Sequence, residues 1–458
     1  MIVEILPLLM FLAVCLCLMM GYSVAFTLAG TALICAGLGI ISGHFDANLL
    51  RAFPDRMFGT MNNYTLIAVP LFVLMGIMLE RSQLAEELLN NMSRLCGRLP
   101  AGMGISVVIV GMLLAACTGI VGATVVTMGL MSLPAMLKRG YSPELATGTI
   151  CATGTLGQII PPSIALVLLG DILSSAYQQA QLQMGVFNPQ PVSVGDLFVG
   201  AIVPGILLVL LYIAYLLFTS MRRPDLAPKG QDENDLDAPK TTELLASLAP
   251  PILLIMLVLG SIISGAATPT EAAGVGALGA TLLAWKKGQL NRAKLADIAR
   301  STTTVTAMVF TILIGASLFS LVFRGFGGEE MITGFFNDLP GGVVAATLIV
   351  MLVIFLLGFI LDFIEITFVV VPIVGPVLLA MGLDPIWLGI MIALNLQTSF
   401  LTPPFGFALF YLRGVAPDTV PTSAIYRGVA PFIVIQLALM LTLAVWPQLV
   451  TWLPAQMH

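Results

Sequence analysis

The sequence predicts an all-α polytopic membrane protein built from two inverted repeats, with about ten spanning helices and two re-entrant hairpins. Of its 458 residues, 58% are hydrophobic and only 9% are charged, whereas a soluble domain has about 25% charged residues. Apolar stretches of about 20 residues recur along the chain, and each is long enough to cross ~30 Å of hydrocarbon. Prolines and glycines also recur at a constant offset, which indicates two homologous halves.

An internal repeat relates the two halves at an offset of 242 residues. The positions that recur are Pro161-Pro162 with Pro403-Pro404, Pro134 with Pro376, Gly140 with Gly382 and Pro143 with Pro385. We assign 1–220 to the first repeat, 221–246 to a cytoplasmic linker and 247–458 to the second repeat. A membrane helix broken at matched positions in both halves is the best sequence pointer to a transporter's binding site.

Ten segments are expected to span the membrane: 2–20, 22–43, 63–80, 141–170, 197–220, 247–264, 268–285, 301–323, 383–412 and 429–448. Two further apolar blocks, 101–137 and 343–381, are too long for one span and are interrupted near their middle. We interpret each block as a re-entrant helical hairpin, because non-helical backbone at this depth must be buried in protein or line a cavity. The amphipathic segments 81–98 and 323–340 are expected to lie in an interface plane.

Basic residues set the orientation, because Lys and Arg are enriched in cytoplasmic loops. With a periplasmic N-terminus, most basic residues fall inside, and the exceptions are Arg51, Arg56 and Arg324. Five spans separate the two repeat starts, and because five is odd, the repeats must be inverted in the membrane. The loops expected to face the periplasm are 44–62, 171–196 and 325–340.

The sequence carries no signature of catalysis or of ATP hydrolysis. Its six cysteines and two histidines have no CxxC spacing and form no pattern suited to zinc. No Walker loop is present, and the net charge of −5 argues against nucleic acid as a partner. A transporter is therefore expected, and not an enzyme.

Small and polar residues surround the interruptions, and we expect four segments to converge on one transport site. They are the hairpin tips 117–124 and 358–367 and the broken spans 153–163 and 395–406. Proline frees carbonyls one turn back, and freed carbonyls with hydroxyls make an oxygen nest suited to sodium. The amides of half-helix N-termini suit an anionic substrate. The candidate substrate contacts are Thr124, Thr155, Ser163, Asp362, Asn395 and Thr398.

Asp362 and Glu365 are the only carboxylates deep in an apolar block. Charge at this depth is expensive and usually functional, so a direct contact with substrate or ion is one interpretation. The other is that both lie at a wetter hairpin tip and only shape it. Gly274, Gly276 and Gly279 form a small-residue face, which close helix packing explains better than a ligand.

In combination, several motifs resemble the large membrane subunit of tripartite ATP-independent periplasmic (TRAP) transporters. In the first half they are the segments 115–119, 123–124, 154–157 and 161–163; in the second they are Asp362, 395–396 and 402–406. The segment 140–148 most resembles the branch often labelled mannitol/chloroaromatic compound, which includes 2-oxo acid carriers.

The resemblance implies an elevator mechanism and two sites for Na+ as the coupling ion. The first site would use Thr118, Gly157, Ile160 and Pro162, and the second would use Gly358, Ser399, Thr402 and Phe405. Two hydroxyls of the family's usual Ser-Gly-Ser-Ser tip are lost here, because Ile120 and Val121 replace them. In contrast, Ser399 replaces the usual glycine and could add a ligand.

The resemblance also implies partners and a location. The partners would be a small four-helix membrane subunit and a periplasmic substrate-binding protein, and the chain would lie in the bilayer of the bacterial inner membrane. We therefore expect sodium-coupled import of a small organic anion, a carboxylate in the simplest case. The alternative is an anion carrier or channel that works without a binding protein.

Overall fold

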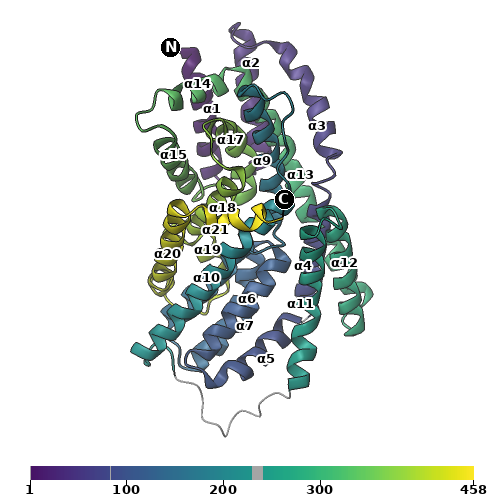
Figure 1. Cartoon of the computed structure of the whole chain (residues 1–458), viewed down its shortest axis with the longest axis vertical. Helices are drawn as coiled ribbons and strands as arrows, with labels where there is room; N and C mark the ends of the chain where they lie inside the picture. The colour runs from purple at the N-terminus through teal and green to yellow at the C-terminus, as the bar shows by residue number, and fades with distance from the viewer. Residues whose placement is uncertain (1, 83, 229–240, 458) are drawn as a thin grey trace. The chain divides into compact units, whose positions relative to one another are not determined.

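The computed structural model describes residues 2–82, 84–228 and 241–457. These residues form helices joined by short connections, with no strand among them (Figure 1). The chain divides into two compact units. Unit 1 comprises Met1–Ile67, Leu168–Ser193 and Thr303–Gly389, and unit 2 comprises Ala68–Val167, Val194–Thr302 and Ile390–His458. The all-α fold class is confirmed, and each unit draws on both halves of the chain.

Unit 1 contains helices from three segments of the chain. They are α1 (Ile2–Met19), α2 (Val24–Ile41), η1 (Ala47–Ala52), α3 (Phe53–Met61), most of α9 (Ile164–Gln183) and of α13 (Arg292–Gly325), α14 (Gly328–Asn337), α15 (Gly342–Leu357), α16 (Phe363–Val369), α17 (Val371–Ala380) and the start of α18 (Pro385–Leu401). Within this unit α1 packs on α2 and α14, and α17 packs on α14 and α15.

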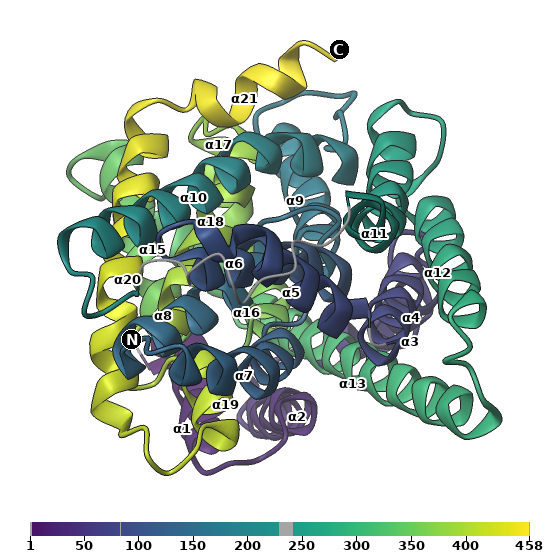
Figure 2. The ribbon, with the colours of Figure 1, turned by 90° about the horizontal axis from the view of Figure 1, so that it is seen from below.

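Unit 2 contains the remaining helices. They are α4 (Ala68–Arg81), α5 (Leu84–Leu95), η2 (Cys96–Arg98), α6 (Gly102–Thr118), α7 (Val121–Lys138), α8 (Pro143–Gly154), η3 (Thr155–Gln158), α10 (Val194–Arg222), α11 (Thr241–Ile263), α12 (Pro269–Lys286), the rest of α18, α19 (Phe407–Val415), α20 (Thr422–Val445) and α21 (Gln448–Ala455). Here α4 packs on α12, and α8 packs on α6, α7 and α20 (Figure 2).

The two expected hairpins and the two broken spans have helix breaks where the sequence predicts them. The block 101–137 is α6 and α7, which a turn at Gly119 and Ile120 separates. The block 343–381 is α15, α16 and α17, and its main break lies at 358–362. Regular α-helix stops at Gly154 and resumes at Ile164 in the first half, and it stops at Leu401 and resumes at Phe407 in the second.

Two equivalent helices of the repeats begin in the same way. Ser142 Oγ caps α8 by accepting a hydrogen bond of 3.2 Å from the backbone N–H three residues on, and Asp384 Oδ1 caps α18 in the same way at 2.8 Å. In each case a proline follows at the first helical position, where its missing N–H costs nothing. Gly140 and Gly382, just before these caps, have φ of 81° and 96°, a region that glycine tolerates best.

Five of the described helices, namely α2, α7, α10, α13 and α20, are long and apolar enough to cross a membrane. The number rises to seven if each of two bent helix pairs counts as one span. Five further apolar helices have 10–17 residues. The expected spans 141–170 and 383–412 fall short of the criterion because their helices are broken. The count of ten full spans therefore stays a prediction.

The three expected outer connections contain helices, of which α14 in 325–340 is the amphipathic helix that the sequence predicts, and their place in the periplasm stays a prediction. α9 continues to Gln183, inside 171–196, and α14 occupies much of 325–340. η1 and α3 occupy much of 44–62, where Asp46 Oδ1 caps η1 by accepting from the N–H of Asn48 at 2.9 Å. Sequence patterns missed α3 because it is short, with nine residues, and has too few apolar residues to form a span.

The ends of the expected linker 221–246 are partly helical. α10 runs to Arg222 and α11 begins at Thr241, while residues 229–240 lie outside the described part of the chain. The amphipathic segments contain α5 and α14, as expected, and their place at a membrane interface stays a prediction.

Glycines permit the closest helix contacts of α12 in unit 2. A Cβ added at Gly276 would lie 2.6 Å from Met75 Sδ, and one added at Gly279 would lie 2.4 Å from Leu254 Cδ1. Neither position has room for a larger residue without a shift of its neighbours. The prediction of helix packing is confirmed for these two glycines, whereas Gly274 has no neighbour closer than ordinary contact.

Candidate functional site

The first helix break lies in unit 2 between α8 and α9. The α-helix α8 ends at Gly154, continues as the 3-10 helix η3 and then loses helical structure before Pro161-Pro162. The peptide bond between these two prolines is cis, and so is that of Pro403-Pro404. Because prolines lack an N–H, the carbonyls of Gly157 and Gln158 lose their helical partners. The hydroxyl of Ser163 donates instead, to the Gly157 carbonyl at 2.7 Å and more weakly to the Gln158 carbonyl at 3.4 Å.

The tip of the first hairpin packs against this break. A Cβ added at Gly157 would lie 3.0 Å from the carbonyl oxygen of Ala115, near the end of α6, so glycine is needed for the contact. The hydroxyls of Thr118 and Thr124 lie 2.7 Å apart at the same tip, and both side chains are buried. The structure thus brings the hairpin tip to Gly157, as the sequence predicts.

Oxygen atoms without hydrogen-bond donors remain at the first break. In the described part of the chain, the carbonyls of Ile160 and Pro162 accept no hydrogen bond. Pro162 is buried, and because a buried carbonyl is almost always paired, its oxygen is a candidate acceptor for water or a cation. Of the first predicted sodium site, the Gly157 carbonyl already accepts from Ser163 Oγ, which leaves the carbonyls of Ile160 and Pro162 and the Thr118 hydroxyl as candidate ligands. The site itself stays a prediction.

The second break lies between α18 and α19, and its residues from position 399 onward belong to unit 2. Pro404 has no N–H to donate to the carbonyl of Phe400, and within the described part of the chain no serine hydroxyl donates to this carbonyl. A Cβ added at Gly406 would lie 2.6 Å from this oxygen and 3.0 Å from that of Thr402. Two carbonyl oxygens therefore converge on the bare Cα of Gly406.

The threonine hydroxyls at the second break donate to backbone carbonyls, and Thr398 is buried while Thr402 is partly exposed. Thr402 Oγ1 donates to the carbonyl of Thr398 at 2.7 Å, and Thr398 Oγ1 donates to the carbonyl of Leu394 at 2.8 Å. A hydroxyl that donates its proton backward keeps its lone pairs for a cation. Ser399 is fully buried, whereas the Phe405 side chain is exposed, so only the backbone oxygen of Phe405 suits an ion.

Gly358, the remaining predicted sodium ligand, and Asp362 belong to unit 1. Gly358 caps the end of α15. Asp362 and Glu365 form a capping box at the start of α16: Asp362 Oδ1 accepts from the N–H of Phe363 at 2.7 Å, and Glu365 Oε2 accepts from the N–H of Asp362 at 2.9 Å. These bonds favour the interpretation that both carboxylates shape the hairpin tip.

Several predicted substrate contacts use their hydroxyls inside the protein. Thr155 Oγ1 donates to the carbonyl of Ala152 at 2.8 Å and accepts from Gln397 Nε2 at 3.3 Å. Thr155 and Gln397 are 242 residues apart, so equivalent positions of the two repeats touch. Such a contact is expected where a twofold axis relates the repeats. Asn395 is buried in the same helix as Gln397.

Gln158 is a polar residue whose importance the sequence patterns did not reveal. Its side chain is 1% exposed, and neither its Nε2 nor its Oε1 has a partner among the described residues. An unpaired buried amide costs about 1–3 kcal/mol, so it is expected to bind something that enters the site. A glutamine inside an otherwise apolar segment beside a proline pair was the available signal.

The amino-acid sequence matches one protein family over residues 9–449, described as "Tripartite ATP-independent periplasmic transporter, DctM component". The chain belongs to this family. It is therefore one membrane component of a TRAP transporter, and its relatives are permeases and not enzymes.

Several characterised TRAP permeases are similar to the chain along most of their length. The C4-dicarboxylate TRAP transporter large permease protein DctM of Pseudomonas aeruginosa is 28% identical over 414 residues, covering 90% of this chain and 89% of its own. The sialic acid permease SiaM of Vibrio cholerae is 27% identical over 87% of this chain and 88% of its own. The ectoine/5-hydroxyectoine permease UehC of Ruegeria pomeroyi is 27% identical over 97% of both chains.

A solved transporter structure has a similar fold. The YdaH transporter of Alcanivorax borkumensis superposes with a TM-score of 0.64 over 96% of this chain and 98% of its own, at 15% sequence identity. This likeness supports a polytopic helical membrane fold for the TRAP permease and carries no information on its substrate.

Proposed function

We propose that this permease imports a small organic anion, in the simplest case a carboxylate, by symport with sodium and through an elevator motion. Na+ is the coupling ion in this proposal. The anion is received from a periplasmic substrate-binding protein, and a small four-helix membrane subunit completes the transporter in the bacterial inner membrane. The multi-pass chain has its N-terminus in the periplasm, and its repeats are inverted.

The observation that carries the proposal is the matched pair of helix breaks at Pro161-Pro162 and Pro403-Pro404. Each break exposes carbonyl oxygens inside an apolar helix, and the first retains unpaired carbonyls at Ile160 and Pro162. Unpaired oxygens inside a membrane protein need a cation or water to offset their desolvation. The anion is supported by the relatives, since several are named for C4-dicarboxylates and one for sialic acid. The 2-oxo acid branch stays a prediction.

Reconstitution in proteoliposomes tests the proposal. The permease, reconstituted with its small subunit and its periplasmic binding protein, would be supplied with radiolabelled succinate or pyruvate under an inward sodium gradient without ATP. We expect uptake that collapses when potassium replaces sodium outside. Uptake at full rate without sodium would refute the coupling, and uptake at full rate without the binding protein would favour the stand-alone carrier or channel.

A further inference from the structure

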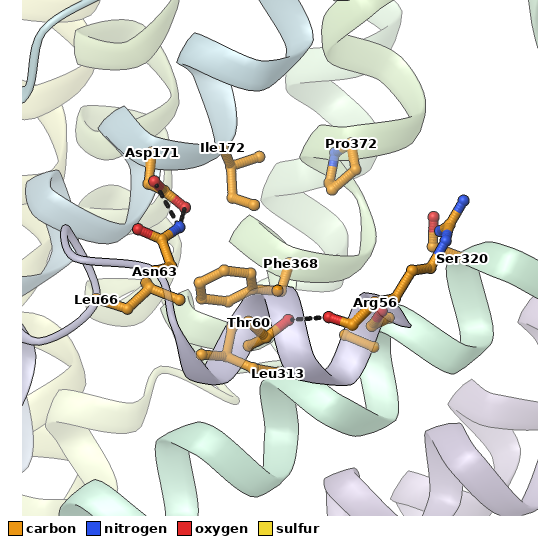
Figure 3. A pocket seen from close by; sticks show the side chains of 13 residues that line it. Arg56, Thr60, Asn63, Leu66, Asp171, Ile172, Leu313, Ser320, Phe368 and Pro372 are labelled. Atoms are coloured by element: carbon orange, nitrogen blue, oxygen red, sulfur yellow. Dashed lines mark hydrogen bonds between the residues drawn. The ribbon is translucent and has the colours of Figure 1, made fainter. Parts of the chain in front are cut away.

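Unit 1 contains a polar cavity of about 280 Å³, separate from the helix breaks (Figure 3). Its walls come from α3, α9, α13, the α16–α17 segment and the connection that follows α3. We call it the Arg56 cavity, and the polar residues that line it are Arg56, Thr60, Asn63, Asp171, Ser317 and Ser320. Its volume lies near the lower end of the range for small-molecule sites, about 300–1,000 Å³.

One end of the Arg56 cavity is already paired. Asn63 Nδ2 donates to both carboxylate oxygens of Asp171 at 3.1 Å, and Asn63 Oδ1 accepts from the N–H of Thr65 at 2.9 Å (Figure 3). Thr60 Oγ1 donates to the backbone carbonyl of Arg56 at 3.0 Å. These three side chains are therefore occupied by neighbours in the same unit.

The other end carries donors without acceptors. In the described part of the chain, the Arg56 guanidinium has no hydrogen-bond or ion-pair partner, and neither do the hydroxyls of Ser317 and Ser320. The two serines are three residues apart on α13, so they share one helix face. In Figure 3 the Arg56 side chain points away from Asp171 and toward the side on which Ser320 lies.

Two guanidinium groups, those of Arg56 and Arg324, lie near each other, while the Asp171 carboxylate, which also lines the cavity, is held by Asn63. Arg56 is half-buried, its pKa is lowered by burial, and the nearby positive charge of Arg324 lowers it further. Arg324 is itself held by Glu329, with Nε 3.3 Å from Oε2, and by Gln179 Oε1 at 3.1 Å. A half-buried guanidinium without an acid partner is costly, and an anion that supplies acceptors would relieve this cost.

We propose that the Arg56 cavity binds the carboxylate of the transported anion before it reaches the helix breaks. The guanidinium offers the planar fork that matches a carboxylate, and Ser317 and Ser320 offer further donors. This inference rests on the proposed function, because it assumes that the permease carries an organic anion. In the proposed orientation α3 is on the periplasmic side, where the binding protein releases its ligand. Arg56 is then a substrate contact, whereas the exposed Arg51 is not among the residues that line the cavity.

Thiol labelling tests the cavity without requiring transport. Ser320→Cys would be treated with two impermeant methanethiosulfonates, one bearing a sulfonate and one a trimethylammonium group, with the unsubstituted chain as the blank for native cysteines. The labelling rate of each reagent is divided by its rate with free cysteine, so that differences in intrinsic reactivity cancel. We expect the ratio of the anionic to the cationic labelling rate at Ser320→Cys to exceed the same ratio at an exposed control, Ala47→Cys, about tenfold or more. The reason is that the unpaired Arg56 guanidinium points toward the Ser320 side of the cavity and attracts anions.

The double variant Ser320→Cys/Arg56→Gln tests whether Arg56 causes the preference for the anionic reagent. The anionic preference should fall to that of the control, whereas Arg51→Gln should leave it unchanged. Acetate, at constant ionic strength, should slow labelling by the anionic reagent more than sulfate does. No anionic preference at Ser320→Cys, or protection by sulfate alone, would overturn the proposal.

Uptake of succinate or pyruvate provides the second arm. Arg56→Gln should raise the KM at least tenfold, Arg56→Lys should recover part of the loss, and Arg51→Gln should leave KM unchanged at saturating binding protein. An unchanged KM in Arg56→Gln would remove the cavity from the transport route. If the unsubstituted permease imported no anion at all, the proposed function would fail, and the labelling arm would still report on the cavity.

Discussion

Replacing Gly406 with alanine should weaken sodium activation of transport. The new Cβ would lie 2.6 Å from the Phe400 carbonyl oxygen, whereas ordinary contact begins at 3.4 Å, so the turn must open by about 0.8 Å (3.4 − 2.6). Both oxygens that converge on Gly406, those of Phe400 and Thr402, belong to backbone that cannot rotate away. Overpacking of this kind costs about 1–3 kcal/mol. If that strain is relieved only by moving the ion ligands, the sodium concentration for half-maximal uptake should rise about 5- to 150-fold.

The assay is sodium titration of uptake in proteoliposomes, together with the thermal midpoint of the purified protein. Gly414→Ala is the matched control, because a Cβ added at Gly414, eight residues along the chain, meets nothing within 4 Å. Alanine in the interior of α19 should be neutral or stabilising by about 0.5–1 kcal/mol. If Gly406→Ala and Gly414→Ala titrate alike in well-folded protein, the second break is not a sodium site.

Three further predictions concern other parts of the chain. Thr402→Ala should weaken sodium activation by about 1–3 kcal/mol while Thr402→Ser retains it, because only the alanine loses the hydroxyl; equal sodium dependence in both would contradict the assignment. Gln158→Leu should leave the thermal midpoint unchanged or raised, since an unpaired amide is removed, but should lower uptake at least tenfold; a lowered midpoint would show that the amide has a partner. A cysteine at Gln190, an exposed position, should react with an impermeant reagent from the periplasmic side; reaction only from the cytoplasm would refute the inverted topology.

The helix breaks were predictable because their cause is local. Proline has no N–H, so Pro-Pro in an apolar helix removes the helical partners of carbonyls one turn earlier. The pair alone does not end a helix, because α11 continues through Pro250-Pro251. The 242-residue offset then identified both breaks, and equivalent residues such as Gly140 and Gly382 adopt the same backbone conformation. The identity of the group that pairs with a freed carbonyl was not predictable. In the first break it is Ser163, and the equivalent residue in the second is Phe405, which cannot replace it.

The sequence contains the pattern of a capping box at Asp362 and Glu365, but the cost of burying charge in a membrane favoured a ligand contact instead. An acidic residue followed three positions later by Glu, before an apolar run, is a signature of a helix start. The cost of charge in a membrane pointed instead to substrate or ion. The observed bonds show that the two carboxylates satisfy backbone N–H groups, which is a sufficient reason for their presence at a hairpin tip.

The Arg56 cavity illustrates what periodic patterns cannot provide. Asn63 and Asp171 are 108 residues apart, and Ser320 comes from a third segment, so no spacing in the sequence brings them together.

The sequence did mark Arg56 as an exception to the charge rule, one of three basic residues expected on the outer face. Two of these three now have separate explanations: Arg324 is paired with Glu329, while Arg51 remains exposed. Arg56 alone faces a polar cavity without an acid partner among the described residues. Arg56 is therefore better explained by a ligand than by the topology of the bilayer, because it is half-buried and unpaired as well as on the unexpected side. An ordinary solvated loop charge would need neither a cavity nor serine hydroxyls beside it.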